Sequence, residues 1–349
     1  MARIAVTLSA TILSDAEGRP RRDLARDVVD DIAAARIAGH EVIVIASGAM
    51  LWGHDAIRSP GRFSVSVPSS DKRSGQRALV RRHMLAAVGR PLMMADYAGW
   101  FGAHGIGVAQ LVMTRDDVAV QDRYERLVVV TDNLVRSGIV PVFDHDDVLA
   151  PDEPASGDDD RPAAMLAAAL RADRLVILTT ADRRYEATAA ALAGAFGVDV
   201  VIADAARREA LRALLLGDAG AATTIPARGH HVGQRRSWIA LTARSRGAIV
   251  VSSFLAEKLA QRKAVSVLLI GIEEVVGIFD PDDVVTVKDV GGRILGRGQI
   301  RLSSDDLRDK VRKRERGEAI EHYGLEVIHC DYLVTSPALR LAHPLAPRQ

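Results

Sequence analysis

Eight carboxylates gather within seventeen residues of this chain, from Asp144 to Asp160, directly after the apolar run from Ile139 to Phe143. His145 is the only basic side chain among them. A strand that ends in clustered acids is a common way for α/β proteins to present groups to a ligand beyond the carboxyl edge of the sheet. A solvated acidic loop would have the same composition. The strand before the acids and the aspartates that precede a predicted helix favour ligand binding.

The start of this stretch also raises the question of a transition-metal site, because Asp144, His145, Asp146 and Asp147 are adjacent. On an extended chain, neighbouring side chains point to opposite faces, so at most two of the four converge. We therefore do not expect a dedicated transition-metal site here.

A second segment that suits ligand binding is Ala46-Ser47-Gly48-Ala49, which follows another apolar run. Glycine lets backbone amides approach an anionic group, and Ser47 can donate a hydrogen bond to it. A tight structural turn fits the same residues equally well. The segment indicates a binding site only in combination with the acidic stretch.

The size and composition of the chain suit a two-domain protein without a membrane anchor. Its 349 residues, 48% of them apolar, exceed the roughly 250 to 300 at which single cores stop growing. The net charge of +1 argues against a protein that binds nucleic acid over its whole surface. Cys330 is the single cysteine, so no intrachain disulfide can form and we expect a cytoplasmic protein. The run from Ile4 to Leu13 is too short and too polar to span a membrane.

The first 225 residues alternate short β-branched runs with Ala- and Arg-rich amphipathic stretches. This alternation is typical of crossover units on a mainly parallel sheet, so we predict an α/β fold. The predicted strands are Ile4–Leu8, Glu41–Ala46, Gly107–Leu111, Val140–Phe143, Leu175–Thr179 and Val198–Ile202. The predicted helices are Asp23–Ala38, Gly75–His104, Arg123–Ser137, Arg161–Ala172 and Arg207–Leu216.

The pattern changes after Pro226. Residues Ala227 to Arg236 are polar and basic with two glycines, as a linker would be. Beyond them we expect a small β-rich module. Its predicted elements are the strands Gly247–Ser252, Ser266–Leu269, Glu274–Ile278, Val284–Val287 and Gly298–Leu302, and one basic helix, Ser304–Arg316.

Blocks of the chain resemble, in order and spacing, those of bacterial glutamate 5-kinases, which belong to the amino acid kinase family. These blocks are ASGAMLWG at 46–53, AAVGRPLMMADYAGWFGAHGIGVAQLVMTRDD at 86–117, GIVPVFDHDDV at 138–148 and GDDD at 157–160. Later blocks resemble the PUA domain appended to those enzymes, including RRSWIAL at 235–241, GAIVVSSFLAEKL at 247–259 and EVIHCDYLV at 326–334. The resemblance implies a three-layer α/β/α amino acid kinase sandwich with a mainly parallel sheet in residues 1–228, a linker at 229–236, a small β-rich PUA domain at 237–335 and a tail at 336–349.

The resemblance also implies ATP-dependent phosphorylation of the γ-carboxylate of glutamate, the first step toward proline. The residues that would bind the acceptor are Ser47, Gly48, Ala49, Asp144, Asp147 and Asp159. Those that would bind the nucleotide are Thr179, Thr180, Asp182, Arg183, Arg184 and Tyr185. Mg²⁺ would be held by Asp147 and Asp159.

The chain departs from the family pattern around the phosphates. Thr7 stands where the family has a lysine, and the segment that carries a second family lysine is missing between Tyr185 and Gly197. Phosphoryl transfer needs positive charge around the moving group. Arg183 and Arg184, or Mg²⁺, are the available compensation.

The chain departs from the pattern at the acceptor as well. Asp144 and Asp159 stand where the family has asparagines. An ionised aspartate can only accept hydrogen bonds and repels a carboxylate, whereas an asparagine amide can donate. We therefore expect a kinase with an altered substrate or weakened activity. The alternative is a catalytically inactive paralogue with a regulatory or metabolite-binding role.

The expected partners are a small-molecule amino acid and further copies of the chain, as a homo-oligomer. RNA is a third candidate, because PUA domains are known for RNA binding and Arg308 to Arg316 supply six basic side chains. Asp309 and Glu315 interrupt that stripe and no aromatic residues are interleaved. We therefore expect a solvated helix face there.

Overall fold

The computed structural model describes residues 1–58, 74–145, 160–179, 187–205, 208–216, 222–261, 265–318, 324–335 and 339. The chain forms two compact units. The first contains Met1–Asp117 and Arg126–His231, and the second contains Val118–Glu125 and the chain from Val232 onward.

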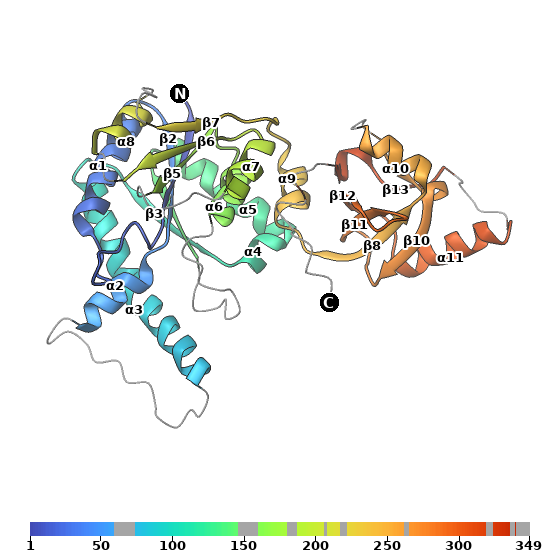
Figure 1. The fold of residues 1–349 in the computed structure, drawn as a ribbon, viewed down its shortest axis with the longest axis horizontal. Helices are drawn as coiled ribbons and strands as arrows, with labels where there is room; N and C mark the ends of the chain where they lie inside the picture. Colours follow the sequence, from blue (N-terminus) through green and yellow to red (C-terminus); the bar gives the residue numbers. More distant parts are fainter. Residues whose placement is uncertain are drawn as a thin grey trace. The chain divides into compact units, whose positions relative to one another are not determined.

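The described residues of the first unit form a seven-stranded sheet in the order β3-β4-β2-β1-β5-β6-β7 (Figure 1). Strand β7 runs antiparallel to β6, and the other neighbours are parallel. The predicted mainly parallel sheet is therefore confirmed. The strands are β1 (Arg3–Leu8), β2 (Glu41–Ala46), β3 (Val108–Met113), β4 (Val140–His145), β5 (Arg174–Thr179), β6 (Asp199–Asp204) and β7 (Thr223–Ile225).

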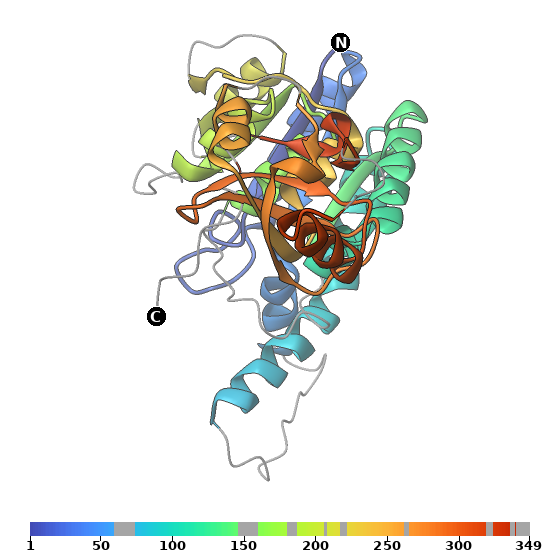
Figure 2. The same cartoon turned by 90° about the vertical axis from the view of Figure 1, so that its right-hand side faces the viewer.

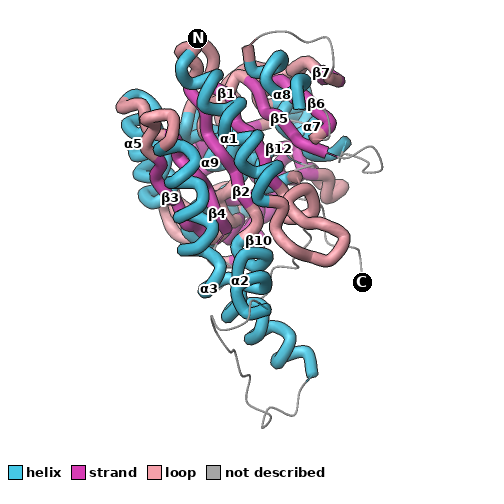
Figure 3. The backbone as a smooth tube through the Cα atoms, turned by 90° about the vertical axis from the view of Figure 1, so that its left-hand side faces the viewer, coloured by secondary structure: helices cyan, strands magenta, loops and turns pink. Residues whose placement is uncertain are grey.

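Helices cover both faces of this sheet, as the three-layer prediction requires. The step from β1 to β2 moves one way along the sheet, whereas the steps from β3 to β4 and from β5 to β6 move the other way. Because parallel crossovers are right-handed, α1 lies on one face and α5 and α7 on the other. Figure 3 views the sheet from the face that carries α1 and α3. The helices are α1 (Arg22–Ile37), α2 (Ala49–Arg58), α3 (Ser74–Gly102), α4 (Arg115–Ala119), α5 (Gln121–Arg136), α6 (Arg161–Ala169), α7 (Ala187–Ala195) and α8 (Arg208–Leu215).

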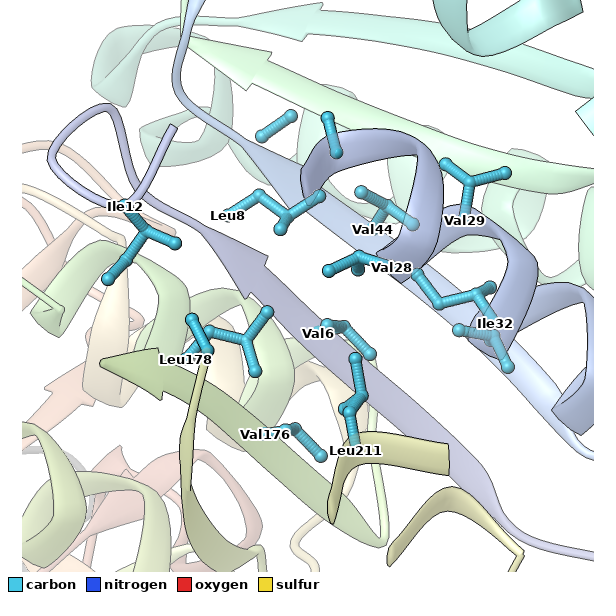
Figure 4. Packing of buried hydrophobic residues seen from close by; sticks show 14 of the residues in the cluster. Val6, Leu8, Ile12, Val28, Val29, Ile32, Val44, Val176, Leu178 and Leu211 are labelled. Atoms are coloured by element: carbon cyan, nitrogen blue, oxygen red, sulfur yellow. The ribbon is translucent and has the colours of Figure 1, made fainter. Parts of the chain in front are cut away.

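The core on the α1 face is formed by alternate residues of the central strands (Figure 4). Since successive side chains of a strand point to opposite faces, Val6 and Leu8 of β1 face α1 while Thr7 faces the other layer. Strand β1 is buried along nearly its whole length, as expected for a central parallel strand covered on both sides. The other labelled members of this cluster are Ile12, Val28, Val29, Ile32, Val44, Val176, Leu178 and Leu211.

The second unit is β-rich, as predicted (Figure 2). Its described residues form a five-stranded sheet, β10-β8-β11-β12-β14, and a two-stranded one, β13-β9. The strands are β8 (Ser245–Val251), β9 (Val267–Leu268), β10 (Ile272–Gly277), β11 (Val284–Asp289), β12 (Ile294–Gln299), β13 (Glu326–Ile328) and β14 (Leu333–Val334). The helices are α9 (Gln234–Leu241), α10 (Ser253–Ala260), α11 (Ser304–Glu315) and the short 3₁₀ turns η1 (Leu269–Gly271) and η2 (Cys330–Tyr332).

The strand predicted at Gly298–Leu302 has the wrong bounds, because β12 begins earlier and ends at Gln299. The sequence did not indicate its first half, since the strand contains two glycines and glycine usually marks a turn or bulge. In the fold they allow close packing: a Cβ on Gly296 would lie 2.7 Å from the Val334 carbonyl oxygen, and one on Gly298 would lie 2.6 Å from the Ile328 side chain. The elements that the sequence did not indicate are mostly short: α2, α4, α7, α9, α10, β7, β13 and β14.

A buried arginine joins α9 to the sheet of the second unit. Arg297 on β12 is 4% exposed, and its guanidinium donates to the carbonyl oxygens of Ala240 and Ala243 at the end of α9. Burial lowers the pKa of Arg297 to about 10, so it stays charged at neutral pH. A cation at a helix C-terminus also complements the helix dipole.

None of the described helices is long and apolar enough to cross a lipid bilayer.

Candidate functional site

The carboxyl ends of four neighbouring strands meet at one edge of the first unit's sheet. Thr7 of β1 lies opposite Ile45 of β2 and Ile177 of β5, and Ile45 lies opposite Phe143 of β4. From β1 the chain turns to β2 on one side, and it later enters β5 on the other side. Open α/β sheets bind ligands at such a reversal, beyond the carboxyl ends of the strands. The predicted site residues that the structure describes all lie at or just beyond this edge.

The segment Ser47–Ala49 links β2 to the start of α2. The amide of Ser47 donates to the carbonyl of Leu8 at 2.9 Å, so the ladder with β1 continues one residue beyond the strand. The Ser47 side chain is exposed, while Gly48 and Ala49 are buried. Backbone amides at a helix N-terminus attract anions. This segment therefore joins an accessible hydroxyl to an electropositive helix end.

Asp144, the penultimate residue of β4, is not a bare carboxylate. Its side chain is 2% exposed, and the Nε of Arg90 donates to its Oδ2 at 2.8 Å. From the sequence alone, this aspartate is only added negative charge. The structure instead brings a cation from α3 against it, and no local sequence signal indicated Arg90.

Helices α2 and α3 cross with their backbones in contact. A Cβ on Gly89 would lie 1.7 Å from the carbonyl oxygen of Ala49, and one on Gly53 would lie 1.9 Å from that of Leu85. Only glycine fits at either position. The crossing therefore fixes Arg90, the neighbour of Gly89, beside the first turn of α2.

The face of α3 that carries Arg90 also carries Met93 and Tyr97, three and seven residues further along. The Met93 sulfur would lie 3.4 Å from a Cβ on Gly48, so this face packs on the Ser47–Ala49 segment. Tyr97 is fully buried, and its hydroxyl has no hydrogen-bond partner among the described residues. Burial, and then the charges of Asp144 and Asp96, raise the pKa of Tyr97, so its hydroxyl remains a donor.

A second polar cluster holds α1, α2 and α3 together. Arg22 pairs with Asp55 at 2.8 Å and with Asp96 at 3.0 Å. The indole of Trp52 donates to Asp96 at 2.7 Å, and the guanidinium of Arg22 lies 5.6 Å from its ring. These contacts orient α2, whose N-terminus forms part of the candidate site.

The side of the site at β1 and β5 is described only in part. Thr7 is 5% exposed, and its Oγ1 has no hydrogen-bond partner within the described ranges. Thr179 closes β5 and is also buried. The predicted site residues Asp147, Asp159, Thr180, Asp182, Arg183, Arg184 and Tyr185 lie outside the described residues.

The second unit offers one cluster of metal-ligand types among its described residues, His329, Cys330 and Asp331. The Nδ1 of His329 already accepts the amide of Asp331 at 3.1 Å, which caps η2. A metal at Nδ1 would displace that hydrogen bond. The cluster is therefore better explained as a structural turn.

Three of the five basic side chains of α11 have partners within the second unit. Arg308 pairs with Asp305, Lys313 with Asp309, and Arg314 donates to the carbonyls of Leu269 and Ile270. Paired and capping cations attract a phosphate backbone less than free ones do. The solvated face of this helix stays a prediction.

Two family models match parts of this chain. The model of the amino acid kinase family matches residues 2–188, and that of the PUA domain matches residues 247–323. Glutamate 5-kinase of Geobacillus kaustophilus (strain HTA426) is 30% identical over 95% of this chain and 97% of its own. Glutamate 5-kinase of Deinococcus radiodurans is 29% identical over 95% of this chain and 99% of its own. A solved structure of isopentenyl phosphate kinase is similar with a TM-score of 0.43, at 15% identity over 62% of this chain and 96% of that one.

An amino acid kinase domain followed by a PUA domain is thus the class of protein that the chain represents. Within that class it belongs to the glutamate 5-kinase family.

Proposed function

We propose that the chain is an ATP-dependent kinase that phosphorylates the side-chain carboxylate of a small amino acid, in chemistry of the proline-biosynthesis type. An oxygen of the acceptor carboxylate attacks the γ-phosphorus of ATP, the bond to the bridging oxygen breaks, and an acyl phosphate and ADP result. Membership of the glutamate 5-kinase family supports this reaction class.

The observation that carries the proposal is the meeting of Ser47 and Asp144 at one sheet edge. They follow or end β2 and β4, which are paired neighbours. Ser47 would donate to the acceptor, and the N-terminus of α2 would attract its negative charge. The pair of Asp144 with Arg90 removes the repulsion that a lone carboxylate would exert on an anionic acceptor.

The phosphoryl donor fits the described residues less well. Thr7 stands where the resemblance implies a lysine, and its buried hydroxyl can donate a hydrogen bond but brings no charge. Lys72 is the only lysine of the first 228 residues and lies outside the described ranges. ATP over Thr179 to Tyr185 and Mg²⁺ on Asp147 and Asp159 rest on the resemblance, so no step is assigned to these residues.

Thr7 also favours the second candidate, a catalytically inactive paralogue whose cleft binds a metabolite and whose role is regulatory. One experiment separates the two. The protein is incubated with MgATP and a panel of amino acids, and any acyl phosphate is trapped with hydroxylamine. We expect a hydroxamate with at least one acidic amino acid, and loss of that product in Ser47→Ala with the melting temperature unchanged. Absence of product throughout, together with no MgATP binding in calorimetry, would favour the paralogue.

Three further points belong to the same proposal. We propose that the kinase domain covers 1–228 and the PUA domain 237–335, with a linker at 229–236 and a tail at 336–349. The chain acts in the cytoplasm as a homo-oligomer, as the resemblance implies. We expect its PUA domain to act without RNA, because Arg308, Lys313 and Arg314 of α11 are engaged by their own unit.

A further inference from the structure

The ion pair between Arg90 and Asp144 is buried at the sheet edge that forms the candidate site. The two side chains are 16% and 2% exposed, so both charges are largely withdrawn from water. Replacing a buried ion pair by apolar residues of similar volume is often neutral or stabilising. A buried pair beside a ligand-binding edge therefore suggests a task beyond stability.

The fold holds this pair in a fixed place relative to the Ser47–Ala49 segment. Gly89 touches the carbonyl of Ala49 through the backbone crossing of α2 and α3. Pro91 follows Arg90 and cannot donate a helical hydrogen bond. Arg90 is thus set between a backbone contact and an interruption of the helical hydrogen bonding, which restricts where its guanidinium can lie.

A buried polar group on the α3 face that carries Arg90 fits a site that a ligand completes. The hydroxyl of Tyr97 is fully buried, and none of the described residues hydrogen-bonds to it. Leaving a buried hydroxyl without a partner costs free energy, and a polar ligand would supply that partner.

The chemistry of the pair indicates which ligand group it meets. A guanidinium has five N–H donors in a planar fork, so one that is held by a carboxylate can still contact a second anion. Arginine and carboxylate form charge-assisted, often bidentate hydrogen bonds. An amino acid acceptor carries such an anion, its α-carboxylate, apart from the carboxylate that is phosphorylated.

We propose that Arg90 is a specificity-determining residue that binds the α-carboxylate of the acceptor, and that Asp144 is a positioning residue that holds the guanidinium in place. The acceptor class, an acidic α-amino acid, rests on the proposed function. In this proposal Asp144 contacts Arg90 and not the acceptor. The asparagine that the family has at this position would instead contact the acceptor directly.

The test measures binding without turnover. L-glutamate and 4-aminobutyrate, which lacks the α-carboxylate, are titrated into the full-length protein and its variants by calorimetry. Arg90→Gln should weaken the binding of L-glutamate about 10- to 100-fold, which is the effect of a lost charge-assisted hydrogen bond. The affinity for 4-aminobutyrate should be unchanged. Arg19, an exposed arginine that pairs with Asp15, provides the control, so Arg19→Gln should change the binding of neither ligand.

A double-mutant cycle tests the role of Asp144. Asp144→Asn should also weaken the binding of L-glutamate. Because Asp144 acts through Arg90, the double variant Arg90→Gln/Asp144→Asn should bind L-glutamate as well as Arg90→Gln alone does. The double variant removes both charges of this pair together, so it remains informative where a single variant folds poorly. Additive losses, equal losses for both ligands, unchanged binding in Arg90→Gln or no binding by the unaltered protein would each overturn the inference. Binding of L-glutamate with this dependence but without hydroxamate formation would instead reject the proposed kinase activity.

Discussion

Thr7 places an uncharged hydroxyl at the carboxyl end of the central strand. The stability of a variant can show whether this hydroxyl has a hydrogen-bond partner. Its Oγ1 is buried without a partner among the described residues. Valine has the same shape without the oxygen, so Thr7→Val should raise the free energy of unfolding in urea by about 1 kcal/mol.

The matched control for this change is Thr131, which is fully buried. Its hydroxyl donates to the carbonyl of Leu127 at 2.7 Å. Thr131→Val should therefore lower stability by about 1 kcal/mol. A similar loss in Thr7→Val would mean that its hydroxyl has a partner in the folded protein.

Asp31 on α1 makes stability depend on pH. Burial, the largest cause, raises the pKa of Asp31 to about 6, with Asp27 and Asp30 acting in the same direction and Arg212 against it. A folded-state pKa above the ordinary 3.8 means that the folded protein binds this proton more tightly than the unfolded chain does. This group therefore lowers stability as the pH rises from about 4 to about 6, and the loss is complete above that window.

Asp31→Asn removes this effect. We expect a gain of about 1 kcal/mol at pH 7.5, reduced from the full pKa shift because the site is partly solvated, and little gain at pH 4. Denaturant unfolding at the two pH values measures it. Asp23→Asn, at an exposed position of the same helix, is the control variant.

Elements with long, regular patterns could be predicted from the sequence, and contacts between distant elements could not. The predicted bounds of β2, Glu41–Ala46, are those of the structure, and α11 differs by one residue at its end. The pair of Arg90 and Asp144 joins residues 54 apart on a helix and a strand. Each looks ordinary in its own segment, because the crossing that brings them together depends on glycines whose packing role has no sequence period.

The crossing of α2 and α3 yields a prediction at the scale of elements. Gly89→Ala must push the two backbones apart, because its Cβ would overlap the Ala49 carbonyl. We expect a loss of about 2 to 3 kcal/mol, as for an overpacked core, together with weaker acceptor binding. Gly99→Ala lies in the same helix with no described atom within 4 Å of the new Cβ, and should stabilise by about 0.5 to 1 kcal/mol. Equal effects in urea unfolding would show that the crossing is not tightly packed.

At the scale of the whole molecule, the second unit is not one continuous piece of chain. It includes Val118–Glu125, which lies inside the region matched by the amino acid kinase family. The indole of Trp238 donates to the carbonyl of Ala119 at 3.1 Å, and Gln299 donates to Gln121 at 3.2 Å. Composition marked the change at Pro226, but contacts over 119 and 178 residues leave no mark in composition.

This arrangement predicts that the chain cannot be cut cleanly between its two units. A protein that ends after His231 keeps Tyr124, which is 1% exposed in the full chain, but loses the residues from Val232 onward that belong to the same unit. The apolar surface left around Tyr124 should increase the binding of a hydrophobic dye and lower the melting temperature. Trp238→Phe in the full chain keeps the aromatic packing and removes only the donor to Ala119, so its loss should be smaller, about 1 kcal/mol. A truncated protein with unchanged melting and dye binding would mean that Val118–Glu125 is stable without the second unit.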